Sequence, residues 1–99
     1  MKITVFPTNN LTWNNQSVRC ALGRNGIYLN KMEGDGATPS GVFPLRQVLF
    51  RADRLATPET GLPTKALKPN DGWSDDPDDP AYNTLIKRPY KYRHEELWR

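Results

Sequence analysis

Proline and glycine are spread along the whole chain, and this spread constrains the fold more than any other feature of the sequence. The 99 residues include 9 prolines and 7 glycines, which are not gathered in one tail. Because proline removes a backbone donor and glycine weakens regular elements, such a chain favours many short elements joined by turns over long helices. Only about 60–65% of the unfolded surface of a chain this short would be buried if it folded alone. We therefore expect a turn-rich globular fold of marginal core size.

Short apolar runs separated by turn residues predict a mostly β fold. The pair Asn14-Asn15 tolerates the left-handed backbone of a tight hairpin turn, so the runs on either side of it are predicted to pair. Pro44 cannot donate to a sheet ladder, so the longest apolar run is placed at an edge or a bulge near that residue. The predicted strands cover residues 3–5, 11–13, 16–22, 27–29, 42–51 and 82–86.

The second half of the chain is predicted to hold one long loop and one helix. Residues 53–80 are rich in proline and turn formers, which is typical of a functional loop, a lid or an insertion. His94-Glu95-Glu96-Leu97-Trp98 predicts the start of a short C-terminal helix that has no cap. We expect one domain, residues 1–99, that is a short-stranded sandwich or barrel and is incomplete at its C-terminus.

The charge pattern argues against a nucleic-acid partner. The net charge is +3, with acidic residues gathered between Asp71 and Asp79 and basic residues gathered from Lys87 onward. A basic end can hold phosphates, but no glycine-rich cradle or aromatic stacking platform accompanies this one, so a solvated surface is the preferred interpretation. No apolar run approaches the length of about 18 residues that a membrane span needs, and the start is too short for a signal peptide.

The residues offer few ways to build an active site. Cys20 is the single cysteine and His94 the single histidine, so an internal disulfide is excluded and we expect no metal or other cofactor. A thiolate pair of Cys20 with His94 would be chemically sensible, but a buried packing role for Cys20 is preferred. The neighbours Asp75 and Asp76 are interpreted as loop or surface carboxylates, not as an acid–base pair. We assign no catalytic residue.

The chain resembles the N-terminal half of the L,D-transpeptidase (YkuD-type) catalytic domain. The resemblance runs in order over nearly the whole chain, although Ser74 stands where related sequences often have Cys. It is carried by the runs Cys20-Ala21-Leu22-Gly23-Arg24-Asn25-Gly26-Ile27, Glu33-Gly34-Asp35-Gly36-Ala37-Thr38-Pro39-Ser40-Gly41-Val42-Phe43-Pro44-Leu45, Arg51-Ala52-Asp53-Arg54, Asp71-Gly72-Trp73-Ser74-Asp75-Asp76-Pro77, Tyr82-Asn83 and His94-Glu95-Glu96-Leu97-Trp98-Arg99.

This resemblance implies a cell-envelope or periplasmic enzyme that cross-links or remodels peptidoglycan. In the family a cysteine thiolate attacks the amide after the third residue of a stem tetrapeptide, releases D-alanine and passes the acyl group to an amine. The family carries this chemistry on a His followed by a Ser/Thr-x-Gly-Cys segment, which is absent from these 99 residues. Cys20 falls in the family's early strand, so we expect the chain to be inactive alone.

Four residues are candidates for a groove that holds peptidoglycan stem peptides. They are Trp73, Tyr82, Asn83 and His94. Trp73, Tyr82 and Asn83 lie in or beside the long loop, where an aromatic wall and an amide suit a peptide ligand. Core packing or loop anchoring is the competing interpretation of each. A non-catalytic module that binds peptidoglycan stems without a nucleophile is the alternative function.

Overall fold

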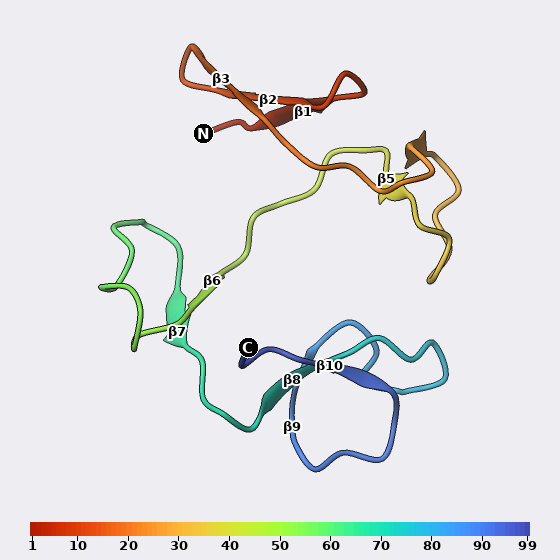
Figure 1. Cartoon of the computed structure of the whole chain (residues 1–99), viewed down its shortest axis with the longest axis vertical. Helices are drawn as coiled ribbons and strands as arrows, with labels where there is room; N and C mark the ends of the chain where they lie inside the picture. Colours follow the sequence, from red (N-terminus) through yellow and green to blue (C-terminus); the bar gives the residue numbers. More distant parts are fainter. The chain divides into compact units, whose positions relative to one another are not determined.

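The computed structural model describes all of residues 1–99 and contains ten strands and no helix (Figure 1). The chain divides into two compact units, Met1–Val42 (unit 1) and Phe43–Arg99 (unit 2). The mostly β prediction is confirmed. The strands are β1 Thr4–Phe6, β2 Asn10–Trp13, β3 Gln16–Arg19, β4 Ile27–Tyr28, β5 Thr38–Pro39, β6 Val48–Phe50, β7 Thr64–Ala66, β8 Asp71–Ser74, β9 Leu85–Lys87 and β10 His94–Glu96.

Unit 1 begins with a three-stranded antiparallel meander in the order β1-β2-β3. The predicted hairpin is confirmed, because Trp13 pairs with Gln16 across a two-residue turn. Asn14 and Asn15 have φ angles of 48° and 62°, the left-handed pair that a tight hairpin turn requires. Asn9, with φ 62°, closes the other turn and accepts a hydrogen bond from Cys20 N–H at 2.9 Å. Asparagine tolerates the left-handed backbone conformation better than most residues, so it can occupy these positions where glycine is otherwise common.

The rest of unit 1 is a compact loop system around the parallel pair β4-β5. Gly23 N–H donates to Thr38 Oγ1 at 2.7 Å, and Thr38 N–H donates to the Gly26 carbonyl at 2.8 Å. Asp35 organises the intervening loop, because its carboxylate accepts hydrogen bonds from Lys31 Nζ at 2.7 Å and from the N–H groups of Met32 and Ala37, both at 2.8 Å. Residues 33–36 therefore form a turn that is held by hydrogen bonds within the loop.

Acid is expected to loosen the Asp35 loop. The hydrogen bonds from Lys31, Met32 and Ala37 lower the pKa of Asp35 from 3.8 to about 2. Because the pKa of Asp35 is lower in the folded protein, the ionised carboxylate stabilises the folded loop. This contribution is complete above pH 3.8 and is lost as the pH falls toward 2. Carboxylate titration by NMR should show this low pKa, and Asp35→Asn should remove that part of the acid dependence of stability. An Asp35 that titrates near 3.8 would contradict the loop structure.

Unit 2 contains two small sheets. One sheet is the parallel pair β6-β7. Two further backbone hydrogen bonds extend this pair at its ends: Val48 N–H donates to the Pro63 carbonyl at 2.9 Å, and Leu67 N–H donates to the Phe50 carbonyl at 2.8 Å. The second sheet is antiparallel in the order β10-β8-β9, so β8 lies in its centre. The four sheets of the molecule are separate, and none closes into a barrel.

The apolar core is small. Phe50 in β6 and Ile86 in β9 are the two buried hydrophobic residues, 8% exposed each, whereas many other large apolar side chains remain exposed. Three polar residues are buried as well, and two of them lie in the central strand β8. Polar contacts thus contribute much of the order around β8.

Three predictions about individual elements are corrected by the structure. The predicted helix at residues 94–98 is wrong, because His94–Glu96 forms β10 and pairs with β8. The predicted loop at residues 53–80 contains β7 and β8, whose short runs pair with distant strands. The strand predicted for residues 42–51 is limited to Val48–Phe50. In the first two cases long-range backbone pairing overrides the local preference. In the third, residues 42–47 have no strand partner, so the strand is shorter than its apolar run.

Candidate functional site

The densest set of polar contacts surrounds the central strand β8 of unit 2. Asp71 and Ser74, at the two ends of this strand, are fully buried. The Asp71 carboxylate accepts hydrogen bonds from Lys68 N–H at 2.8 Å and from the Lys87 ammonium on β9. The hydrogen bond from Lys87 holds the pKa of Asp71 below its ordinary value. A buried charge is tolerated here because it is paired and hydrogen-bonded.

A second buried carboxylate, Asp79, joins three parts of unit 2. Its Oδ2 atom accepts hydrogen bonds from Ser74 Oγ and Tyr90 OH, both at 2.6 Å, and its Oδ1 atom accepts one from Ala81 N–H at 2.8 Å. Burial raises the pKa of Asp79, but these hydrogen bonds outweigh burial and the pKa lies below its ordinary value. The Ser74 hydroxyl is fully buried and donates to a carboxylate, which leaves it unsuited to attack a substrate.

Alkaline titration of Tyr90 tests this network. The hydrogen bond to Asp79 raises the pKa of Tyr90 from 10.0 to about 12. Because the folded pKa is raised, the neutral phenol stabilises unit 2 fully below pH 10.0, and this contribution is lost as the pH rises toward 12. Ultraviolet absorbance of the phenolate should show Tyr90 ionising late, and Asp79→Asn should lower the pKa of Tyr90 toward 10.0. A Tyr90 that ionises near its ordinary pKa of 10.0 in the folded protein would contradict the network.

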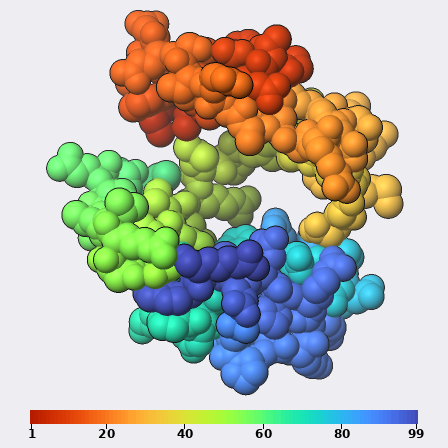
Figure 2. Space-filling model, viewed as in Figure 1, coloured from red at the N-terminus to blue at the C-terminus, as the bar shows by residue number.

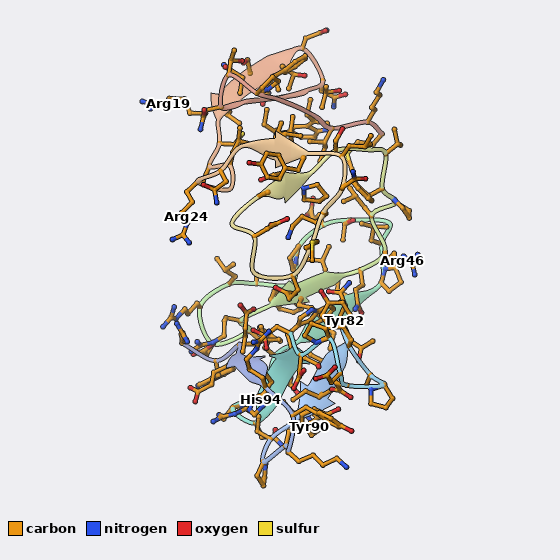
Figure 3. All side chains as sticks on the ribbon, turned by 90° about the vertical axis from the view of Figure 1, so that its right-hand side faces the viewer. Arg19, Arg24, Arg46, Tyr82, Tyr90 and His94 are labelled. Atoms are coloured by element: carbon orange, nitrogen blue, oxygen red, sulfur yellow. The ribbon has the colours of Figure 1, made fainter.

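His94 is held by two neighbours on one face of this sheet. Arg88 Nε donates to His94 Nε2 at 3.2 Å, so the Nδ1 atom carries the proton and donates to the Tyr92 carbonyl at 2.7 Å. Arg88 also donates to Glu96 Oε1 at 2.7 Å, and the Tyr90 ring meets the His94 ring edge-on with centroids 5.9 Å apart (Figure 3). Both imidazole nitrogens are therefore engaged within unit 2.

The structure brings two of the four predicted groove residues together. Trp73 Nε1 donates to Asn83 Oδ1 at 3.0 Å, and Asn83 adopts a left-handed φ of 61°. Tyr82 is adjacent; the residue is 38% exposed, and its N–H donates to the Asp79 carbonyl at 2.9 Å. His94 pairs with Ser74, the residue after Trp73, so alternation along the strand places His94 and Trp73 on opposite faces of the sheet.

Most carboxylates of the acidic run accept hydrogen bonds from their own loop and from other segments of unit 2. Arg93 binds Asp75 through Nε at 3.2 Å, and Asp76 accepts hydrogen bonds from Asp78 N–H at 3.0 Å and Arg93 N–H at 3.3 Å. This agrees with the interpretation of Asp75 and Asp76 as loop carboxylates. No group of three or more metal-binding side chains gathers anywhere in the chain, and no helix is long and apolar enough to cross a membrane.

An arginine contact in unit 2 was not indicated by the sequence pattern. Arg51 donates to both carboxylate oxygens of Asp53, at 2.8 and 2.6 Å, and to the Arg99 carbonyl at 2.7 Å. Its guanidinium also lies 3.6 Å from the centre of the Trp98 ring. Figure 2 shows the dark-blue end of the chain packed on the yellow-green segment that follows β6. We call Arg51, Asp53, Trp98 and Arg99 the arginine clamp.

A shallow hollow of about 380 Å³ lies beside the same sheet and is lined by Pro69, Asn70, Arg88 and Pro89. None of the four predicted groove residues lines it, although Arg88 contacts His94.

Cys20 belongs to unit 1 and is partly buried, and its backbone N–H continues the hydrogen bonding of the hairpin. No protein-family model, curated protein or solved structure matches this chain.

Proposed function

We propose that this chain is part of an L,D-transpeptidase-type domain that acts on peptidoglycan stem peptides in the cell envelope. The observation that carries the proposal is the joining of separated segments of the resemblance within unit 2. The arginine clamp connects residues 51–54 with residues 97–99, and the β8-β10 pairing connects residues 71–77 with residues 94–96. Segments of one domain signature are expected to pack against one another, and these contacts within unit 2 support the proposal in that way.

Trp73 and Asn83 are the residues to which we assign substrate contact. An exposed hydrogen bond holds the Trp73 indole against the Asn83 side-chain amide. The face of the indole ring and the amide group therefore lie together on the surface, beside the 75–82 loop. Peptide ligands are held by such an apolar wall combined with a few oriented polar groups. Tyr82 extends this surface, and the sandwich-like arrangement of the family remains part of the proposal.

The acyl transfer itself needs a thiolate beside an imidazole, and we do not assign it to Cys20 and His94. Both nitrogens of His94 are occupied by Arg88 and Tyr92, so this imidazole has no free site to take a proton from a thiol. The proposed reaction therefore requires a nucleophile other than Cys20. Without one, the same Trp73–Asn83 surface would serve the alternative function, a stem-binding module with no catalysis.

A carbapenem provides the first test, because it acylates the catalytic thiol of the proposed class. We expect the 99-residue chain to show no acyl adduct by intact-mass spectrometry. Alkylation of Cys20 by iodoacetamide, in native and denatured samples, would serve as the control for thiol reactivity. Rapid carbapenem acylation of Cys20 would overturn the assignment of the nucleophile elsewhere.

Binding of a stem tetrapeptide tests the surface. We expect saturable binding followed by NMR, with Trp73→Phe weakening it about tenfold, the equivalent of 1.4 kcal/mol, because phenylalanine cannot donate to Asn83. Trp13→Phe in unit 1 is the matched control and should leave the affinity unchanged. Absence of any tetrapeptide binding by the folded chain would contradict both the transpeptidase proposal and the binding-module alternative.

A further inference from the structure

The outer edge of β10 carries backbone groups that no other strand uses. Asp75 N–H donates to the Arg93 carbonyl and Leu97 N–H donates to the Asp71 carbonyl, both at 3.3 Å. Hydrogen-bonded and non-hydrogen-bonded pairs alternate along an antiparallel ladder, so Glu95 exchanges hydrogen bonds with Trp73. The N–H and C=O groups of His94 and Glu96 consequently point away from β8. Neither residue takes another backbone hydrogen bond.

The side chain at the centre of this edge is an unpaired carboxylate. Glu95 is exposed and forms no salt bridge or side-chain hydrogen bond, whereas Glu96 is bound by Arg88. At the opposite edge of the sheet, the exposed charge of β9 is Lys87, which is already bound to Asp71. The β10 edge is thus the one that combines free backbone groups with a free charge.

We propose that the outer edge of β10 binds an extended, basic peptide segment by adding it as a fourth strand. The backbone of the incoming segment would exchange hydrogen bonds with His94 and Glu96. The residue opposite Glu95 would then form a non-hydrogen-bonded pair, in which side chains approach most closely. A lysine or arginine at that position gains a cross-strand ion pair. The recognition is strand addition in which main-chain bonds supply affinity and one charge supplies selectivity.

Charge disfavours a second copy of this chain as the occupant in the register that uses the outward groups of both His94 and Glu96. Two β10 edges related by a two-fold axis would match His94 of one copy with Glu96 of the other. The centre of such a pair would set Glu95 directly against Glu95 of the second copy. Like charges directly opposite each other destabilise a strand pair, so a basic segment is the complementary partner.

The test uses two capped peptides of about seven residues, the length of an ordinary strand. They alternate threonine and valine and differ only in a central lysine or glutamate. We expect the lysine peptide to shift and protect the amides of His94 and Glu96 in the full chain, as followed by NMR hydrogen exchange, and the glutamate peptide to bind at least tenfold more weakly. Glu95→Lys should reverse this preference.

A backbone variant separates strand addition from simple charge attraction. Glu96→Pro removes the outward N–H without disturbing the ladder to β8, because proline is tolerated at an edge with its nitrogen facing solvent. It should abolish binding of the lysine peptide, while Glu96→Thr, which loses the same Arg88 contact but keeps the N–H, should retain it. Equal binding of both peptides, protection elsewhere in the chain, or binding by Glu96→Pro would overturn the proposal. Should Glu96→Pro fail to fold, protection of His94 and Glu96 in the unmodified chain decides the matter.

Discussion

Replacing Gly23 with alanine is expected to destabilise unit 1 by about 3 kcal/mol, the upper end of the usual cost of overpacking. A Cβ atom on Gly23 would overlap the Gly36 carbonyl oxygen and approach the Cα and carbonyl carbon of Ala37 to 2.7 Å. These are backbone atoms held by the Thr38 and Asn25 hydrogen bonds, so they cannot move aside cheaply. The loop system around β4-β5 should open as a consequence.

Amide hydrogen exchange of Thr38 and Asn25 is the measurement that reports this opening, since both N–H groups are bonded within the loop system. Gly61→Ala is the matched control, because nothing lies within 4 Å of its added Cβ. That substitution should leave stability unchanged or raise it slightly by reducing the entropy of the unfolded chain. Equal stability of the two variants would show that the close approach at Gly23 is absent.

Ile86→Ala is expected to cost about 2–5 kcal/mol, the usual range for truncating a buried aliphatic side chain. Ile86 is one of the two buried hydrophobic residues, and its Cδ1 atom lies 2.9 Å from the position of a Cβ on Gly72. The side chain therefore fills the space left open by that glycine. Because little other apolar surface is buried in unit 2, few neighbouring side chains can collapse into the cavity.

Denaturant unfolding followed by tryptophan fluorescence should record this loss, because Trp73 lies on the strand paired with β9. Leu55→Ala removes a side chain that is 61% exposed and serves as the control, with an expected change within about 0.5 kcal/mol. If the two variants were equally stable, Ile86 would not be a core residue.

The sequence was sufficient to predict the local features of this fold. Paired asparagines flanked by alternating residues specify a hairpin through the backbone angles of two positions, and the hairpin formed as predicted. The first strand also depends on neighbours in the chain, because it pairs with the strand that follows it. Such features do not depend on residues far along the chain, so the local amino-acid sequence is enough to predict them.

The elements that sequence reasoning missed all depend on partners far along the chain. Asp71-Gly72-Trp73-Ser74 has the composition of a loop, and it forms a central strand because β9 and β10 pair with it on both sides. His94–Glu96 has helix-forming residues but extends beside that strand. In both cases the free energy of sheet pairing exceeds a weak intrinsic preference.

Sequence reasoning singled out two residues that the structure places in contact. Trp73 and Asn83 were selected for their aromatic and amide chemistry, and the structure joins them by a hydrogen bond. Asp79 is one of five aspartates between residues 71 and 79, and the sequence does not distinguish it from the others. Its role follows only from its burial and its contacts with Ser74 and Tyr90. No periodicity marks Arg51 as the partner of Trp98, because the two lie on segments without regular alternation.

The β1-β2-β3 meander has a consequence for the order in which the chain acquires structure. Each of its pairings joins neighbours connected by a tight turn, so the entropy of closing these loops is small and hairpins of this kind form within about 1–10 μs. The pairing of β8 with β10 must instead bring together residues about twenty positions apart, and contacts of that separation form more slowly. A nascent chain should therefore present a finished amino-terminal sheet while its carboxy-terminal sheet is still assembling.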